Sequence, residues 1–179
     1  MAKLKTNYSI LIVEDEDKIA KILTTYLGLY PKFTKIVRAR DGVEAMQKIS
    51  NQEFDLIITD LVLPKRDGIT LIDSIRKVPK YYNQKIMVVS GCLTPDLTLR
   101  CVKRNVKHII VKPFTARQLL LKSVGFLKAE KSTRKTVDTL LEKMARRYLL
   151  KVTDDGKPSI SDEMKDFVSS VIEDSRKKF

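Results

Sequence analysis

The chain has 179 residues, of which 43% are hydrophobic, and a formal net charge of +13. This length suits one ordinary domain with an appendage and falls short of two typical domains. No apolar stretch reaches the roughly 20 residues that span a bilayer, and no signal-peptide pattern follows the basic N-terminus, so we expect a cytoplasmic protein with no membrane partner. Cys92 and Cys101 are too few for a disulfide framework or a metal site, and we expect both to be small buried residues.

Short apolar runs alternate five times with segments of helical period. The runs predict strands at Ile10–Val13, Phe33–Val37, Leu56–Thr59, Ile86–Val89 and Ile109–Val111. The other segments predict helices at Asp17–Gly28, Gly42–Ser50, Ile69–Lys77, Pro95–Arg104 and Thr115–Leu127. The runs are continuous Val, Ile and Leu, which is typical of strands buried on both faces. This alternation predicts an α/β fold with a parallel sheet covered by helices on both sides. Asn105, which tolerates the left-handed conformation, is expected to end the fourth helix.

The pattern changes after residue 127. Residues 128–135 are polar and form either a linker or an exposed helical continuation. Two apolar stripes at helical spacing then predict two amphipathic helices in a C-terminal extension, residues 129–179. The stripes comprise Val137, Leu140, Leu141, Met144 and Tyr148, then Met164, Phe167, Val168, Val171 and Ile172. A hairpin that pairs 148–152 with 159–161 across the turn at Asp155-Gly156 is the alternative.

Chemically active side chains stand where the predicted strands end. Glu14 and Asp15 follow the first strand, Asp60 the third, Ser90 the fourth and Lys112 the fifth. The carboxyl ends of parallel strands meet at one edge of a sheet, which is where α/β proteins bind ligands. The sequence therefore predicts one site that holds acids, a hydroxyl and an amine.

This set of residues is suited to phosphoryl chemistry. Two carboxylates about 4 Å apart repel by roughly 4 kcal/mol at an effective dielectric constant near 20, so acids gathered in one place need a counter-charge. Mg²⁺ or Mn²⁺ fits an oxygen-rich site that keeps some water, and Lys112 supplies a fixed cation. Asp60 is the candidate nucleophile, which would form an aspartyl phosphate.

The motifs at these strand ends resemble those of the bacterial response-regulator receiver domain, over residues 8–128. They read Val13-Glu14-Asp15-Glu16, Asp60-Leu61-Val62-Leu63-Pro64-Lys65-Arg66-Asp67-Gly68, Val88-Val89-Ser90-Gly91 and Val111-Lys112-Pro113-Phe114. The resemblance implies a flavodoxin-like fold with strand order 2-1-3-4-5. It also implies phosphotransfer from a histidine kinase or a histidine phosphotransfer protein to Asp60, without enzymatic activity beyond this self-phosphorylation and dephosphorylation.

The resemblance also implies a role for each residue. Asp15 and Asp60 would ligate the metal, Glu14 would act through water or at the rim, and the backbone carbonyl of Val62 would complete the ligand set. Ser90 would be the switch hydroxyl and Lys112 the phosphate-contacting lysine, followed by a cis bond to Pro113. Ile109 takes the place of an aromatic residue that the family often uses in switching.

The output is predicted from charge and from the tail. Most of the positive excess lies in the first 125 residues, including the cluster Arg100, Lys103, Arg104 and Lys107. Such a surface attracts an acidic partner or nucleic acid. We favour a two-component signalling protein that controls a protein partner, its own tail or homodimerisation. The alternatives are a DNA-binding transcriptional regulator and a scaffold that does not respond to phosphorylation.

Overall fold

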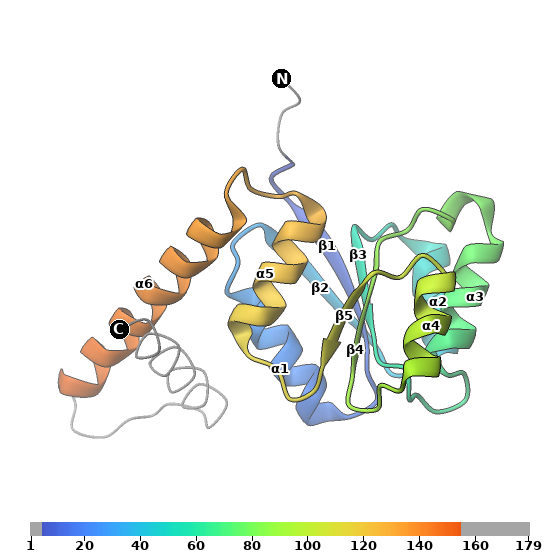
Figure 1. The fold of residues 1–179 in the computed structure, drawn as a ribbon. Helices are drawn as coiled ribbons and strands as arrows, with labels where there is room; N and C mark the ends of the chain where they lie inside the picture. The colour runs from blue at the N-terminus through green and yellow to red at the C-terminus, as the bar shows by residue number, and fades with distance from the viewer. Residues whose placement is uncertain (1–4, 155–179) are drawn as a thin grey trace. The chain divides into compact units, whose positions relative to one another are not determined.

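The structure, a computed structural model, describes residues 5–154, and the chain divides into two compact units, Met1–Phe114 and Thr115–Phe179. In the first unit, strands and helices alternate along the chain (Figure 1). The elements are β1 (Tyr8–Val13), α1 (Asp17–Gly28), β2 (Phe33–Ala39), α2 (Gly42–Asn51), β3 (Leu56–Thr59), α3 (Gly68–Lys77), the short 3-10 helix η1 (Pro79–Tyr81), β4 (Ile86–Ser90), α4 (Pro95–Lys103) and β5 (His108–Val111).

The five strands form one parallel sheet of order β2-β1-β3-β4-β5, which confirms the predicted flavodoxin-like topology. The register brings the carboxyl ends of neighbouring strands level with one another. Val13 of β1 lies beside Thr59 of β3, Thr59 lies beside Val88 of β4, and Ser90 lies beside Val111 of β5. The residues that follow these ends therefore emerge along one edge.

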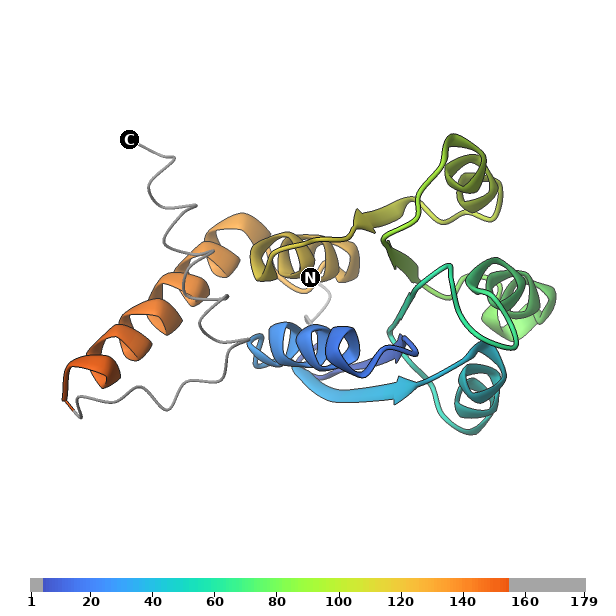
Figure 2. The ribbon, with the colours of Figure 1, turned by 90° about the horizontal axis from the view of Figure 1, so that it is seen from below.

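Helices cover both faces of this sheet within the first unit. Figure 2 shows α2, α3 and α4 on one face and α1 on the other. The central strands β1 and β3 are almost wholly buried, as continuous Val, Ile and Leu runs require. The core on the α2–α4 face is built mainly from Leu11, Ile57, Ile72, Ile75 and Val88. Between these two apolar layers the strand ends are fixed in place.

The predicted element boundaries hold within about two residues, because local capping signals mark most of them. Asp41, Asp67 and Thr94 each accept hydrogen bonds from the first turn of α2, α3 and α4. Asn105 has a φ of 59°, which confirms the predicted left-handed residue after the fourth helix. The prediction that both cysteines are buried is wrong for Cys92, which is exposed in the β4–α4 loop, whereas Cys101 on α4 is buried.

In the second unit, the described residues 115–154 form the helices α5 (Ala116–Leu127) and α6 (Thr133–Asp154), and α6 packs along α5. Arg117 on α5 donates to both carboxylate oxygens of Asp138 on α6, at 2.8 and 3.2 Å. Val137 and Leu141, from the first predicted apolar stripe, are buried. A left-handed residue, Lys128, ends α5.

The tail is helical where the alternative placed a strand. Residues 148–152 lie within α6, so the predicted hairpin is wrong. The second predicted tail helix lies outside the described residues. The predicted domain boundary between residues 128 and 129 falls at the turn from α5 to α6 and stays a prediction. Within residues 5–154, no helix has both the length and the apolar character needed to cross a membrane.

Candidate functional site

The strand ends singled out in the sequence form a cluster at the carboxyl edge of the sheet. Asp60 follows β3, which lies between β1 and β4, so Glu14 after β1 and Ser90 at the end of β4 flank it. Lys112 follows β5, and its main-chain N–H donates to the carbonyl oxygen of Ser90 at 3.0 Å. We call Glu14, Asp60, Ser90 and Lys112 the carboxyl-edge site.

The two carboxylate oxygens of Asp60 have different surroundings, although the residue is only 7% exposed. Oδ1 accepts hydrogen bonds from Ser90 Oγ at 2.5 Å and from the main-chain N–H groups of Leu61 and Val62 at 2.5 and 3.1 Å. Among the described residues, Oδ2 has a single donor, Lys112 Nζ at 2.6 Å. One oxygen is therefore held by the main chain, whereas the other faces only the lysine.

Lys112 joins Asp60 to a second buried acid. Its Nζ also donates to Glu14 Oε2 at 2.7 Å, and Glu14 is 2% exposed. Burial raises the pKa of the Glu14 carboxyl; the Lys112 contact opposes this rise and the Asp60 charge adds to it. Burial alone would lower the pKa of Lys112, but its bonds to the two carboxylates outweigh burial and raise that pKa. The lysine is therefore a fixed cation between two acids at neutral pH.

The lysine is followed by an unusual backbone feature. The Lys112–Pro113 peptide bond is cis, which confirms the prediction. Ile109, where the family often has an aromatic residue, is half-buried on β5.

The segment after β1, residues 14–17 (Glu-Asp-Glu-Asp), is called the acidic loop below. Glu14 is buried, whereas the neighbouring Asp15 is exposed. Across residues 5–154, no three His, Cys, Asp or Glu side chains are gathered closely enough to hold a metal ion. The donors available do fit Mg²⁺ in kind, because that ion binds through one or two carboxylates and keeps several waters. The assignment of Asp15, Asp60, Glu14 and the Val62 carbonyl to the metal stays a prediction.

The loop that carries Val62, between β3 and α3, is held by a close backbone approach and an ion pair. A Cβ atom on Gly68 would lie 2.1 Å from the carbonyl oxygen of Asp60, so only glycine fits there. Lys65, with a φ of 59°, places its Nζ 2.6 Å from Oδ2 of Asp41, the residue that caps α2. The sequence contains no signal for the pairing of Asp41 with Lys65.

A second contact that the sequence did not reveal holds the acidic loop. Arg38 on β2 donates to the main-chain carbonyls of Glu14 and Asp15 and to the carboxylate of Asp17. Nothing in the sequence distinguishes Arg38 from Arg40, because the difference arises from the path of the acidic loop beside the end of β2.

The predicted basic face on α4 is used partly inside the first unit. Arg100, Lys103 and Lys107 are exposed. In contrast, Arg104 donates two hydrogen bonds to the Asp73 carboxylate on α3, at 2.6 and 2.8 Å, and this contact lowers the pKa of Asp73. Arg104 therefore ties α4 to α3, and three of the four predicted basic side chains remain available to a partner.

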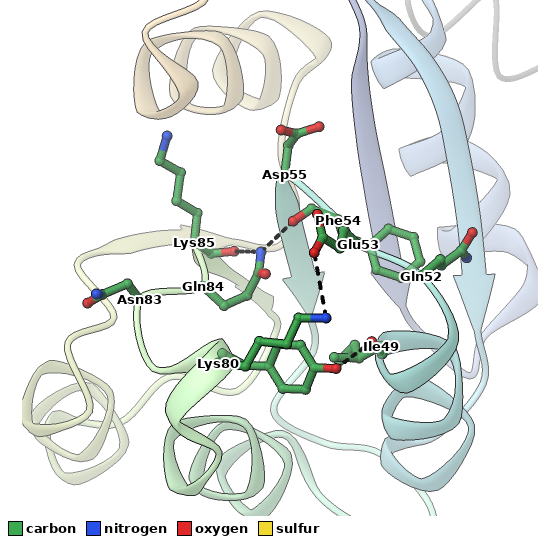
Figure 3. A pocket seen from close by; sticks show the side chains of 10 residues that line it. Ile49, Gln52, Glu53, Phe54, Asp55, Lys80, Asn83, Gln84 and Lys85 are labelled. Carbon is green, nitrogen blue, oxygen red and sulfur yellow. Dashed lines mark hydrogen bonds and ion pairs between the residues drawn. The ribbon is translucent and has the colours of Figure 1, made fainter.

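A hollow of about 370 Å³ lies at the opposite end of the sheet, where β3 and β4 begin (Figure 3). Its lining comes from residue 49, residues 52–55, residues 80–81 and residues 83–85. The Gln84 amide donates to the main-chain carbonyl of Phe54 at 3.0 Å, and the Tyr81 hydroxyl donates to the main chain of α2 at 3.1 Å. Because these polar groups already have partners, we assign no site to this hollow.

The fold and the site thus define a class of protein: a parallel α/β domain that carries buried acids and a lysine at the edge where such sheets bind ligands. Residues 10–124 match the family model described as the response regulator receiver domain, and the chain belongs to this family. The family serves phosphorylation-based two-component signalling.

Known relatives agree with this family. The chain is 25% identical over 69% of its length to hybrid signal transduction histidine kinase D of Dictyostelium discoideum, covering 8% of that protein. It is 32% identical over 72% of its length to a protein-glutamate methylesterase/protein-glutamine glutaminase of Rhodopseudomonas palustris, covering 35% of it. The chain thus spans less than half of these curated relatives.

A solved structure shows the same fold. The signal receiver domain of an HD domain-containing protein from Pseudomonas fluorescens Pf-5 matches with a TM-score of 0.63 and 26% identity. The match covers 68% of this chain and 95% of that domain. The similarity therefore concerns the receiver part of the chain.

Proposed function

We propose that Asp60 accepts a phosphoryl group from a histidine kinase or a histidine phosphotransfer protein, and that the chain is thereby a phosphorylation-controlled switch. The observation that carries this proposal is the buried cluster in which Lys112 contacts both Asp60 and Glu14 while Ser90 contacts Asp60. Buried acids that share one cation cost the fold stability, and at a ligand-binding edge such a cluster is typical of a functional site. No catalytic activity on another molecule is proposed.

The unequal surroundings of the Asp60 oxygens support a different role for each of them. Oδ2, with Lys112 as its donor, is the nucleophile, and Oδ1 stays in place on its main-chain donors. A P–O bond forms to Oδ2 as the bond between phosphorus and the donor's nitrogen or oxygen breaks, and the electron pair of that bond leaves with the donor. Lys112 and Ser90 then transfer their hydrogen bonds to the phosphoryl oxygens.

The chain's own charges prepare this step. Lys112 offsets charge on the incoming group, and the raised pKa of Lys112 keeps it protonated near neutral pH. Mg²⁺ or Mn²⁺, held by Asp15, Asp60 and the Val62 carbonyl with Glu14 nearby, would supply further positive charge to the phosphoryl oxygens.

The output surface that we propose is α4. Leu99 and Val102 are 52% and 51% exposed beside the basic side chains of Arg100 and Lys103. Apolar and basic groups together suit an acidic protein partner. Nothing observed on the described residues favours DNA as the partner, and the scaffold alternative does not explain why the acids and the lysine converge.

Intact-protein mass after incubation with acetyl phosphate and Mg²⁺ tests the proposal. The wild type should gain one phosphoryl group, and Asp60→Asn should gain none. Asp55→Asn is the matched control, because Asp55 precedes the same strand at its other end. A phosphoryl group on Asp60→Asn, or none on the wild type with either acetyl phosphate or a phosphorylated histidine donor, would contradict the assignment.

A further inference from the structure

We propose that Arg38 is a positioning residue that holds the acidic loop in the shape required for metal binding and phosphorylation; this inference rests on the function proposed above. The guanidinium makes three contacts with successive parts of the loop. Nε donates to the Glu14 carbonyl at 3.0 Å, Nη2 to the Asp15 carbonyl at 2.8 Å, and Nη1 to Asp17 Oδ1 at 2.5 Å.

These contacts continue the sheet beyond the point where its ladder ends. The Glu14 main-chain N–H still donates to the carbonyl of Ala39 on β2, at 3.0 Å. After that bond the chain turns into α1, and the carbonyls of Glu14 and Asp15 need other partners. The Arg38 side chain supplies both, and it does so from a position that is only 25% exposed. A single side chain thus fixes the route from β1 to the first residue of α1.

The orientation of both acids depends on that route. Glu14 is buried against Lys112, whereas Asp15, the next residue, is exposed. A change in the path of the main chain through Glu14 and Asp15 would displace both carboxylates at once. Arg38 therefore acts on the acids through their main chain and needs no contact with the metal or the phosphoryl group.

Arginine is required for this arrangement because the three acceptors are met by three different nitrogens of one planar group. The Lys ammonium is a point charge on a flexible stem and cannot reproduce the fork. Arg38→Lys therefore preserves the charge and removes the geometry.

If Arg38 acted only through its charge, its removal would change the affinity for Mg²⁺ in the opposite direction. Loss of a positive charge beside a cation site strengthens cation binding, whereas loss of the positioning contact weakens it. Arg40 is the matched control, because it lies two residues further along the chain, just beyond the end of β2 at Ala39, and its side chain is 68% exposed. Its guanidinium pairs with Asp17 at 3.5 Å, and its main-chain N–H, which donates to Glu44, is kept in Arg40→Ala. Arg40→Ala removes the same charge without touching the loop's carbonyls.

Isothermal titration with Mg²⁺ alone, at constant ionic strength, separates these roles. We expect Arg40→Ala to bind Mg²⁺ up to about twofold more tightly through its charge. Arg38→Lys and Arg38→Ala should bind it about tenfold more weakly, the usual effect of losing a residue that orients a ligand. Thermal unfolding of Arg38→Lys should stay within a few degrees of the wild type.

Phosphorylation by acetyl phosphate provides the second readout. Arg38→Lys should need about tenfold more Mg²⁺ for half-maximal rate, with a maximal rate within about twofold of the wild type. The inference would be overturned if Arg38→Lys bound Mg²⁺ as tightly as the wild type does. It would also be overturned if Arg38→Ala bound Mg²⁺ more tightly than the wild type, as Arg40→Ala is expected to. In either case, phosphorylation of the wild type would leave the proposed function standing. A wild type that neither binds Mg²⁺ nor gains a phosphoryl group on Asp60 would overturn both.

Discussion

The two ends of the sheet use charged side chains in opposite ways. At the carboxyl end, two buried acids share one lysine, so the local charge is unbalanced. At the amino end, Asp55 accepts hydrogen bonds from Lys5 at 2.5 Å and from the main-chain N–H of Ser9 at 2.8 Å, and Lys5 is exposed. The hollow lies at the amino end, whereas the chemistry that we propose lies at the carboxyl end. The proposal for the site therefore rests on converging buried charge rather than on the hollow.

The largest expected difference between the ends is the room that each leaves for a side chain at a glycine. Gly68→Ala places a Cβ atom 2.1 Å from the carbonyl oxygen of Asp60, whereas a Cβ on Gly28, at the end of α1, meets nothing within 4 Å. We expect Gly68→Ala to lower the free energy of unfolding by about 3 kcal/mol or more, and Gly28→Ala to change it by less than about 1 kcal/mol. Urea unfolding followed by circular dichroism measures both. Equal effects would mean that the carboxyl end relaxes as freely as the rest of the unit.

The comparison also shows what the sequence could predict. Asp60, Ser90 and Lys112 were recognisable because each directly follows or ends an apolar run, and a parallel sheet brings such ends together. The left-handed Asn105 likewise depends on local sequence, whereas the cis bond before Pro113 was implied by the family resemblance.

Contacts between distant elements were not predictable in this way. Arg38 and Arg40 are the same residue type two positions apart, and only the path of the acidic loop gives one of them three acceptors. Residue type also gave a wrong prediction of burial for Cys92. Cys92 follows Gly91 in a loop and is exposed, whereas Cys101 faces the core from a helix. These features depend on the packing of elements that a local pattern does not encode.

The second difference between the ends is how much the lysine at each end contributes to the free energy of unfolding. Lys112→Met leaves Glu14 and Asp60 buried without a counter-charge, and we expect a loss of about 3 kcal/mol at pH 7. Lys5→Met removes an exposed pair with Asp55 and should cost less than about 1 kcal/mol. Chemical denaturation of both variants provides the measurement.

The pH dependence sharpens this second prediction. The deficit of Lys112→Met should shrink as the pH falls toward 4, because protonation removes the unbalanced carboxylate charge. In the wild type the folded pKa of Lys112 is raised above 10.5, so its contribution to stability is complete below pH 10.5 and is lost as the pH rises through the folded value. A deficit that does not change with pH would show that Lys112 acts through packing rather than charge.

The smallest difference concerns a single acid at each end. The pKa of Glu14 is raised above 4.5 by burial, so its contribution to stability is fully present below pH 4.5 and is lost as the pH rises through the folded pKa. Glu14→Gln removes this loss while Lys112 keeps its contact with Asp60, so the variant should melt a few degrees above the wild type at pH 7 and at the same temperature near pH 4. Glu53→Gln, at the exposed amino end and 3.6 Å from Lys80, should leave the melting temperature unchanged at both pH values. If the wild type has a higher melting temperature than Glu14→Gln at pH 7, the bond to Lys112 outweighs the cost of burying the Glu14 charge. The carboxyl-edge acids would then stabilise the fold as the amino-end pairs do.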